Sequence, residues 1–177
     1  MHGVPRGFSL LEVVVATSIL VVGVAGVAPL LVVASRANQS ARNTTLASLL
    51  AQQKMEQLRA LEWARDPSGG LLSDVDTDLT VAFAVGSGGS GLRPSPAGSL
   101  DRNVDGYCDF IAADGRVVGG GSVPPAGAAY VRRWSIEPLP PDPDEALVLQ
   151  VLVTRDGSLP MSPEDVRLTS IRVRGGL

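Results

Sequence analysis

The sequence predicts an α+β protein in which one long N-terminal helix precedes a small antiparallel β-sheet. Residues 13–34 form an apolar run without a charge, and at about 1.5 Å per residue a helix of this length just crosses a bilayer core. The twenty glycines and thirteen prolines of the 177-residue chain lie mostly beyond residue 67, which indicates short elements joined by turns. This length allows one modest domain and an anchoring helix.

The composition excludes several classes of function. The formal net charge is −3 and no basic run of the kind that follows phosphates is present, so we expect no nucleic-acid partner. The single histidine, His2, precedes the apolar run, which leaves the rest of the chain without Ser-His-Asp, Cys-His or histidine-ligated metal chemistry. The single cysteine, Cys108, is expected to be a small buried hydrophobic residue near Tyr107 and Phe110.

The apolar run has one acid at its start. Glu12 lies four residues after Phe8, and an ionised carboxylate at that depth costs about 2–3 kcal/mol on the insertion scale. One interpretation is that Glu12 extends to the lipid headgroups from an ordinary signal anchor. The other is that it pairs with a cation, because ionisable groups inside a membrane are usually functional.

Residues 6–13 read Arg-Gly-Phe-Ser-Leu-Leu-Glu-Val and resemble the class III signal of type IV prepilins. The resemblance implies that a prepilin peptidase cuts the chain on the cytoplasmic side, between Gly7 and Phe8, and methylates the new N-terminal phenylalanine, Phe8. It also implies that Glu12, the fifth residue of the mature chain, is the assembly residue. Pro29 fits the proline that the family often has in this helix.

Elementary chemistry supports these implied roles. Gly7 has no Cβ, so the bond after it can be presented to a protease in an extended form. Cleavage exposes an α-amine on Phe8 that is largely cationic at neutral pH, and Glu12 of a neighbouring subunit can compensate that charge. Pro29 removes a backbone donor and clashes with the carbonyl of Ala25, which predicts a kink or local melting of the helix.

The resemblance also implies a pilin fold and a division of the chain. Residues 1–7 are the leader, 8–34 the transmembrane and filament-core helix, 35–66 the distal half of the helix, and 67–177 an antiparallel β-sheet head. Residues 52–58 within the distal half are similar to minor pilins of the PilV type and to I-type pseudopilins of type II secretion.

The implied function is a minor structural subunit of a type IV pilus or a type II secretion pseudopilus, and such a subunit is not expected to be an enzyme. Such a subunit is made as a single-pass precursor in the bacterial inner membrane, with its head outside the cytoplasm, and later enters the pilus or the periplasmic pseudopilus. The implied partners are a prepilin peptidase, other pilin or pseudopilin subunits, an inner-membrane assembly platform and the lipid bilayer.

The helix is expected to continue beyond the membrane. Leu46, Leu50, Leu58 and Leu61 recur on one broad face, which predicts a helix that extends to about residue 65. The turn-forming residues 66–70 then end it.

The remaining chain predicts an antiparallel sheet packed on the distal half of this helix. The almost wholly apolar stretch 147–154 is expected to be the central strand. A change of phase between Leu168 and Ile171 predicts a β-bulge in the last strand. The expected strands are residues 80–85, 107–112, 116–118, 130–137, 147–154 and 166–173.

One loop matches the opening of a calcium site. Asp101, Asn103 and Asp105 alternate as oxygen ligands, and Asp109 lies at a further ligand offset, but Ala112 occupies the position of the bidentate glutamate. The alternative is a solvated turn, which Asp and Asn commonly form. Apart from this calcium hypothesis, no cofactor is expected.

A second hypothesis for the whole chain keeps the anchor uncleaved. The protein would then be a single-pass membrane protein whose extracytoplasmic domain binds a ligand such as a sugar or calcium. The two hypotheses differ at Gly7, because only the first requires the bond after this residue to be cut.

Overall fold

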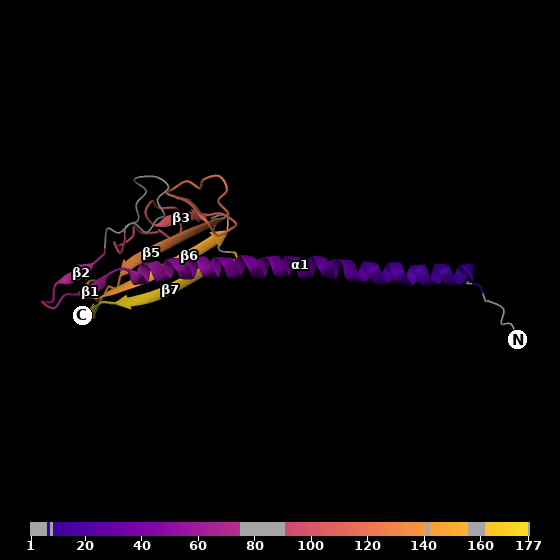
Figure 1. The fold of residues 1–177 in the computed structure, drawn as a ribbon, viewed down its shortest axis with the longest axis horizontal. Coiled ribbons are helices and arrows are strands. Elements are labelled where there is room, and N and C mark those ends of the chain that lie inside the picture. Colours follow the sequence, from indigo (N-terminus) through magenta and orange to yellow (C-terminus); the bar gives the residue numbers. More distant parts are fainter. Residues whose placement is uncertain (1–6, 8, 75–90, 141, 156–161, 177) are drawn as a thin grey trace. The chain divides into compact units, whose positions relative to one another are not determined.

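The computed structural model describes residues 7, 9–74, 91–140, 142–155 and 162–176. It confirms the predicted α+β class, because one long helix, α1 (Leu10–Ala60), is followed by a small antiparallel sheet (Figure 1). The chain divides into two compact units, residues 1–41 and residues 42–177. Helix α1 begins in the first unit and ends in the second.

The first unit contains the apolar part of α1. The carbonyl of Ser9 accepts hydrogen bonds from the backbone N–H groups of Glu12 (3.0 Å) and Val13 (3.2 Å), which starts the helix. The sequence predicts a kink or local melting of the helix at Pro29. The helix continues through this residue, so it does not melt there, and the kink stays a prediction. By length and composition α1 can cross a membrane, and its most apolar stretch is not buried against other parts of the chain.

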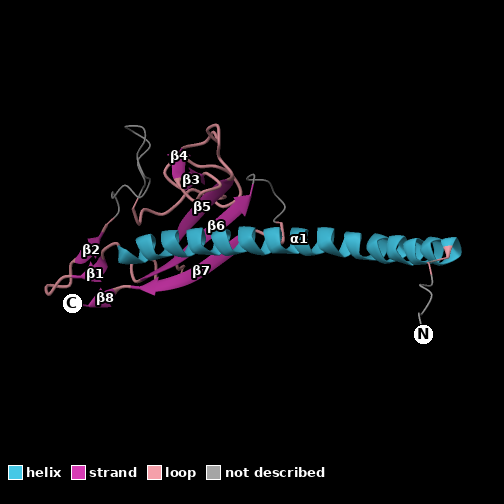
Figure 2. Cartoon of the chain, turned by 45° about the vertical axis from the view of Figure 1, so that its right-hand side comes forward, coloured by secondary structure: helices cyan, strands magenta, loops and turns pink. Residues whose placement is uncertain are grey.

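In the second unit, the C-terminal part of α1 packs on the sheet (Figure 2). The buried apolar residues of this part recur every three or four positions, as one helix face requires: Ala47, Leu50, Ala51, Met55 and Leu58. They meet the inner face of the sheet, which contributes Trp134, Ile136, Leu147, Leu149, Val151 and Val153 to the same core.

Five strands form the larger sheet, in the order β4-β3-β5-β6-β7, and every neighbouring pair is antiparallel. The stretch predicted to be the central strand is β6, which lies inside the sheet, although β5 is the middle strand. The predicted strand at residues 80–85 lies outside the described residues. The bounds are Cys108–Ile111 (β3), Val117–Gly120 (β4), Tyr130–Pro138 (β5), Ala146–Arg155 (β6) and Val166–Val173 (β7).

The predicted bulge in β7 is wrong. Strands β6 and β7 pair in unbroken register from Ala146 opposite Val173 to Val153 opposite Val166. The apolar pattern changes phase because the outer face of β7 is itself apolar at one end, where Ile171 is 60% exposed.

Arg172 takes the inward position that an apolar residue would otherwise fill. Its Nη1 donates to the carbonyl of Leu58 at 2.9 Å, and its Nη2 donates to the carbonyl of Leu61. Leu58 lies in the last turn of α1 and Leu61 directly follows the helix. Carbonyls at the end of a helix have no partner within it, so Arg172 stabilises the C-terminal end of α1.

Helix α1 ends at Ala60 rather than near residue 65, because the next residues form a strand, β1 (Trp63–Arg65). Strand β1 pairs antiparallel with β2 (Leu71–Ser73) and parallel with β8 (Gly175–Gly176), which makes a second small sheet that the sequence pattern did not predict. The guanidinium of Arg174 lies 3.5 Å from the centroid of the Trp63 ring. The strand pairing of β1 and the stacking of Arg174 on Trp63 stabilise a strand at residues 63–65, although the apolar periodicity there predicts a helix.

Candidate functional site

The segment before α1 carries the predicted cleavage site. Gly7 is exposed and not helical, and Phe8 lies outside the described residues. The helix begins only at Leu10, so the bond after Gly7 precedes it. A Cβ built on Gly7 meets no described atom within 4 Å, which means that packing within the described chain does not require glycine at this position.

The first turn of α1 carries the predicted assembly residue, Glu12, whose side chain is exposed. Thr17 and Ser18 follow it and donate their hydroxyls to the carbonyls of Val13 (2.7 Å) and Val14 (2.8 Å), so their polar groups are satisfied within the helix. The Glu12 carboxylate makes no hydrogen bond or ion pair with any residue that the structure describes. It is open to a partner.

Residues 5–28 match a family model described as the prokaryotic N-terminal methylation motif. The chain carries a prepilin-type N-terminal motif. This prepilin motif contains Gly7, Phe8 and Glu12 and ends directly before Pro29. It supports a type IV pilin-like precursor, and together with the apolar part of α1 it fits an anchor in the inner membrane. Neither the curated proteins nor the solved structures include a match to the chain.

The prepilin motif bears on partners as well as on identity. It implies processing by a prepilin peptidase and assembly with other pilin subunits. The cut after Gly7, the methylation of Phe8 and the pairing of Glu12 stay predictions for this chain, as does the resemblance to the PilV type or to I-type pseudopilins.

The four predicted calcium ligands have different surroundings. Asp101 and Asp105 are exposed, whereas Asp109 is fully buried. The Oδ1 of Asn103 accepts a hydrogen bond from the Nε of Arg133 at 2.9 Å. Among the residues described, no three His, Cys, Asp or Glu side chains are grouped to hold a metal ion. Asp109 is therefore turned away from the other three residues, and calcium binding by the loop stays a prediction.

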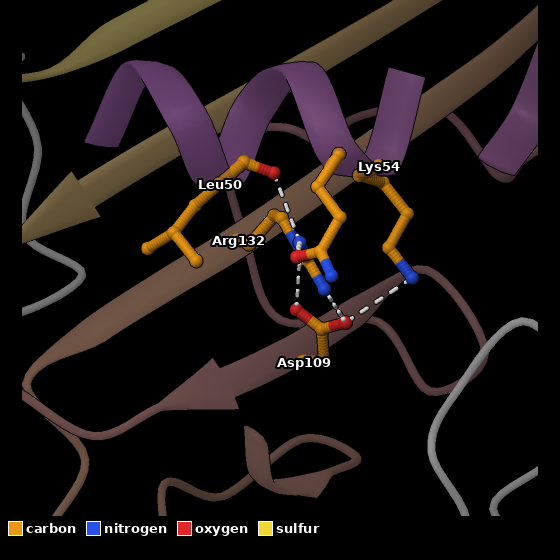
Figure 3. Close-up of polar contacts among 5 residues, drawn as sticks. Leu50, Lys54, Asp109 and Arg132 are labelled. Atoms are coloured by element: carbon orange, nitrogen blue, oxygen red, sulfur yellow. Dashed lines mark hydrogen bonds and ion pairs between the residues drawn. The ribbon is translucent and has the colours of Figure 1, made fainter. Parts of the chain in front are cut away.

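Asp109 instead joins a buried ionic cluster with Lys54 and Arg132, which connects α1 to β3 and β5 (Figure 3). The Arg132 guanidinium donates from Nε to Oδ1 (2.9 Å) and from Nη2 to Oδ2 (2.7 Å) of Asp109. The Nζ of Lys54 lies 3.2 Å from Oδ2. The Nη1 of Arg132 also donates to the backbone carbonyl of Leu50 at 2.9 Å. These bonds fix the helix on the sheet.

Sequence reasoning missed this cluster. Asp109 and Arg132 lie opposite each other only through the register of β3 and β5, which the chain order does not reveal. Lys54 lies on the helix face that packs against the sheet, with its Nζ 4.2 Å from the centroid of the Trp134 ring. The one available signal was Lys54, a charged residue on an otherwise apolar helix face. A charge in such a position indicates either that it has a buried partner of opposite charge or that the face is wrongly assigned to the core.

Cys108 is buried, as predicted. It lies with Phe110 and Val131 in a small cluster on the outer face of the sheet, the face turned away from α1. Its Sγ lies 2.9 Å from the carbonyl oxygen of Gly121. Burial, with a smaller contribution from the Asp109 charge, raises the pKa of Cys108 to about 11. The thiol is therefore protonated at neutral pH, and a protonated thiol is a weak nucleophile.

Proposed function

We propose that this protein is a minor structural subunit of a type IV pilus or of a type II secretion pseudopilus. The observation that carries the proposal is the prepilin motif at residues 5–28, which leads into a long apolar helix. The precursor is held in the bacterial inner membrane with its head outside the cytoplasm, is cut after Gly7 and methylated on Phe8, and then enters the filament through α1. An inner-membrane assembly platform and other pilin or pseudopilin subunits are its partners.

The surroundings of Gly7 support the cleavage step. Gly7 is exposed and lies before the helix, where a peptidase can reach the chain. No described neighbour excludes a larger side chain at this position, so a packing requirement does not explain the glycine. Recognition by another protein does explain it, because a Cβ next to the scissile bond restricts the backbone and fills the space that a protease subsite needs.

The exposed helix supports the assembly step. Val13, Val14 and Val15 are all exposed, although consecutive residues point about 100° apart around a helix. Apolar side chains thus cover the whole circumference, and each gains roughly 1.5–3 kcal/mol on full burial. Lipid covers them in the precursor, and neighbouring helices cover them in a filament.

Two glycines in this helix support close contact with another helix. A Cβ built on Gly23 or Gly26 meets no described atom within 4 Å. Glycine inside a helix costs roughly 1 kcal/mol relative to alanine, so its presence twice in four residues indicates a compensating role. Small residues allow the backbones of two membrane helices to approach closely.

Processing is tested by co-expression with a prepilin peptidase. The wild-type chain should lose its seven leader residues, and Gly7→Val should stay full length because a β-branched side chain stiffens the backbone at the cut. Mass spectrometry of the purified proteins measures both outcomes. Gly3→Val is the matched control, since it makes the same substitution inside the leader and should be cut normally. A full-length wild-type chain would favour the alternative, an uncleaved single-pass protein with a ligand-binding head.

A further inference from the structure

We propose that a pocket on the outer face of the five-stranded sheet binds a small zwitterion that carries both an ammonium and a carboxylate group. The pocket has a volume of about 430 Å³ and is open to one side. Strands β5, β6 and β7 form its floor, and a loop at residues 98–101 forms one wall. Its polar and charged lining consists of Asp101, Ser135, Glu137, Gln150 and Arg167.

Ser135 indicates that this pocket is built to hold a ligand. The residue is 2% exposed, and its Oγ is buried without a hydrogen-bond partner among the described residues. Its neighbours in β5, Trp134 and Ile136, belong to the core beneath α1, so the alternation of a strand directs Ser135 to the outer face, toward the pocket. A buried hydroxyl without a partner is unfavourable, and a polar ligand atom would supply the missing bond.

Arg167 supplies the site for the carboxylate group. Its Nε (3.1 Å) and its Nη2 both donate to the Oε1 of Gln150, the residue that lies across from Ser135 in the register of β5 and β6. These bonds fix the plane of the guanidinium on the sheet. They leave Nη1 and the amide N–H groups of Gln150 as donors for an anionic group, which a guanidinium binds with charge-assisted hydrogen bonds.

Two carboxylates supply the site for the ammonium group. Asp101 is exposed on the pocket wall and Glu137 is exposed on β5. The charge of Asp101 also attracts Arg133, whereas Glu137 accepts no hydrogen bond or ion pair from the residues described. Glu137 is on β5, opposite Val148, and Arg167 is on β7, opposite Leu152. The two charged residues are therefore separated by two strand spacings, about 9.5 Å, across the sheet and by four residues, about 13 Å, along it. Opposite charges therefore lie on opposite sides of the pocket.

This charge arrangement selects the class of ligand. A purely anionic ligand would meet the two carboxylates, and a purely cationic one would meet the guanidinium, so each has one unfavourable contact. A ligand that carries both charges has no such unfavourable contact. The buried side chain of Leu152, 3% exposed, gives the floor an apolar surface, and the volume suits a ligand of about the size of a dipeptide. The inference concerns the head alone and does not depend on whether the chain is cut after Gly7.

Diglycine is the probe for the test, and the full-length protein in detergent micelles is the sample. Titration calorimetry should show binding of diglycine, and the N-acetylated and C-amidated forms, each lacking one charge, should bind roughly tenfold or more weakly. Equal affinity for all three forms, or no binding of diglycine at millimolar concentration, would overturn the proposal. N-acetylglucosamine serves as a neutral probe, and tighter binding of this sugar than of diglycine would overturn it as well.

Substitutions locate the binding. Arg167→Gln should weaken diglycine binding roughly tenfold, whereas Arg116→Gln, an exposed arginine outside the pocket, should leave it unchanged. Glu137→Gln is the second variant, and it changes an exposed side chain to one of the same size. It should weaken diglycine but leave the N-acetylated form, which has no ammonium, unaffected. Unchanged diglycine affinity in both pocket variants would place any binding elsewhere and refute the assignment.

Discussion

At Glu12 the two interpretations of the acid lead to different outcomes on substitution. If the carboxylate only reaches the headgroups, Glu12→Leu removes an unfavourable group and the subunit behaves normally. If it pairs with the Phe8 amine of a neighbouring subunit, the variant is still cut but loses the contact that fixes its position in the filament. We expect the second outcome, with the mature variant accumulating in the inner membrane.

Fractionation into membrane and filament pools measures this, supported by crosslinks between cysteines placed along α1 in a Cys108→Ser background. Glu12→Asp keeps the charge and is the matched control, so it should enter filaments far better than Glu12→Leu. Normal incorporation of Glu12→Leu would contradict the pairing, while leaving the prepilin motif itself in place.

The prepilin motif was predictable because its residues are contiguous in the chain, whereas the roles of the individual residues stay predictions. Gly7, Phe8 and Glu12 lie within one short motif, and reading it requires no knowledge of the fold. The pattern of alternating acids from Asp101 onward was misleading at Asp109, because the spacing does not reveal where the loop ends and β3 begins. In β3 the alternation of the strand turns Asp109 to the helix and away from solvent.

At the scale of elements, β6 and β7 were predicted closely because their patterns are long and regular. The end of α1 was not predicted correctly. The apolar periodicity of the helix continues past Ala60 to Leu61, but the contacts that end the helix come from residues near the C-terminus of the chain. Arg172 bonds the last carbonyls, and the C-terminal strand β8 pairs with β1. Local pattern contains no signal for partners more than a hundred residues away.

The ionic cluster gives a prediction at this scale, because it holds α1 against β3 and β5. Asp109→Asn should lower the free energy of unfolding by about 3–5 kcal/mol, since it leaves Lys54 and Arg132 without the carboxylate that both contact inside the core. Denaturant or thermal unfolding of the full chain in detergent measures the change. Asp114→Asn is the matched control on an exposed turn and should change it by no more than about 0.5 kcal/mol. Equal effects of the two substitutions would show that the cluster contributes no specific stability.

For the whole molecule, the α+β class followed from the contrast between an apolar first part and a polar part rich in glycine and proline. The structure divides the chain at residues 41 and 42, within α1, so a single helix belongs to both units. The pocket on the outer sheet face was beyond sequence reasoning. Its lining comes from three strands and a loop, and only their register places Ser135, Gln150 and Arg167 together.

The central claim is that the chain is a prepilin-like precursor, and the mature N-terminus of the protein isolated from its native host tests it most directly. Mass spectrometry of the intact protein and of its N-terminal peptide reads that end. The account predicts a chain that begins at Phe8, lacks residues 1–7 and carries one methyl group on its α-amine. A mature protein that begins at Met1 or His2, or at any residue after the apolar run, would contradict it.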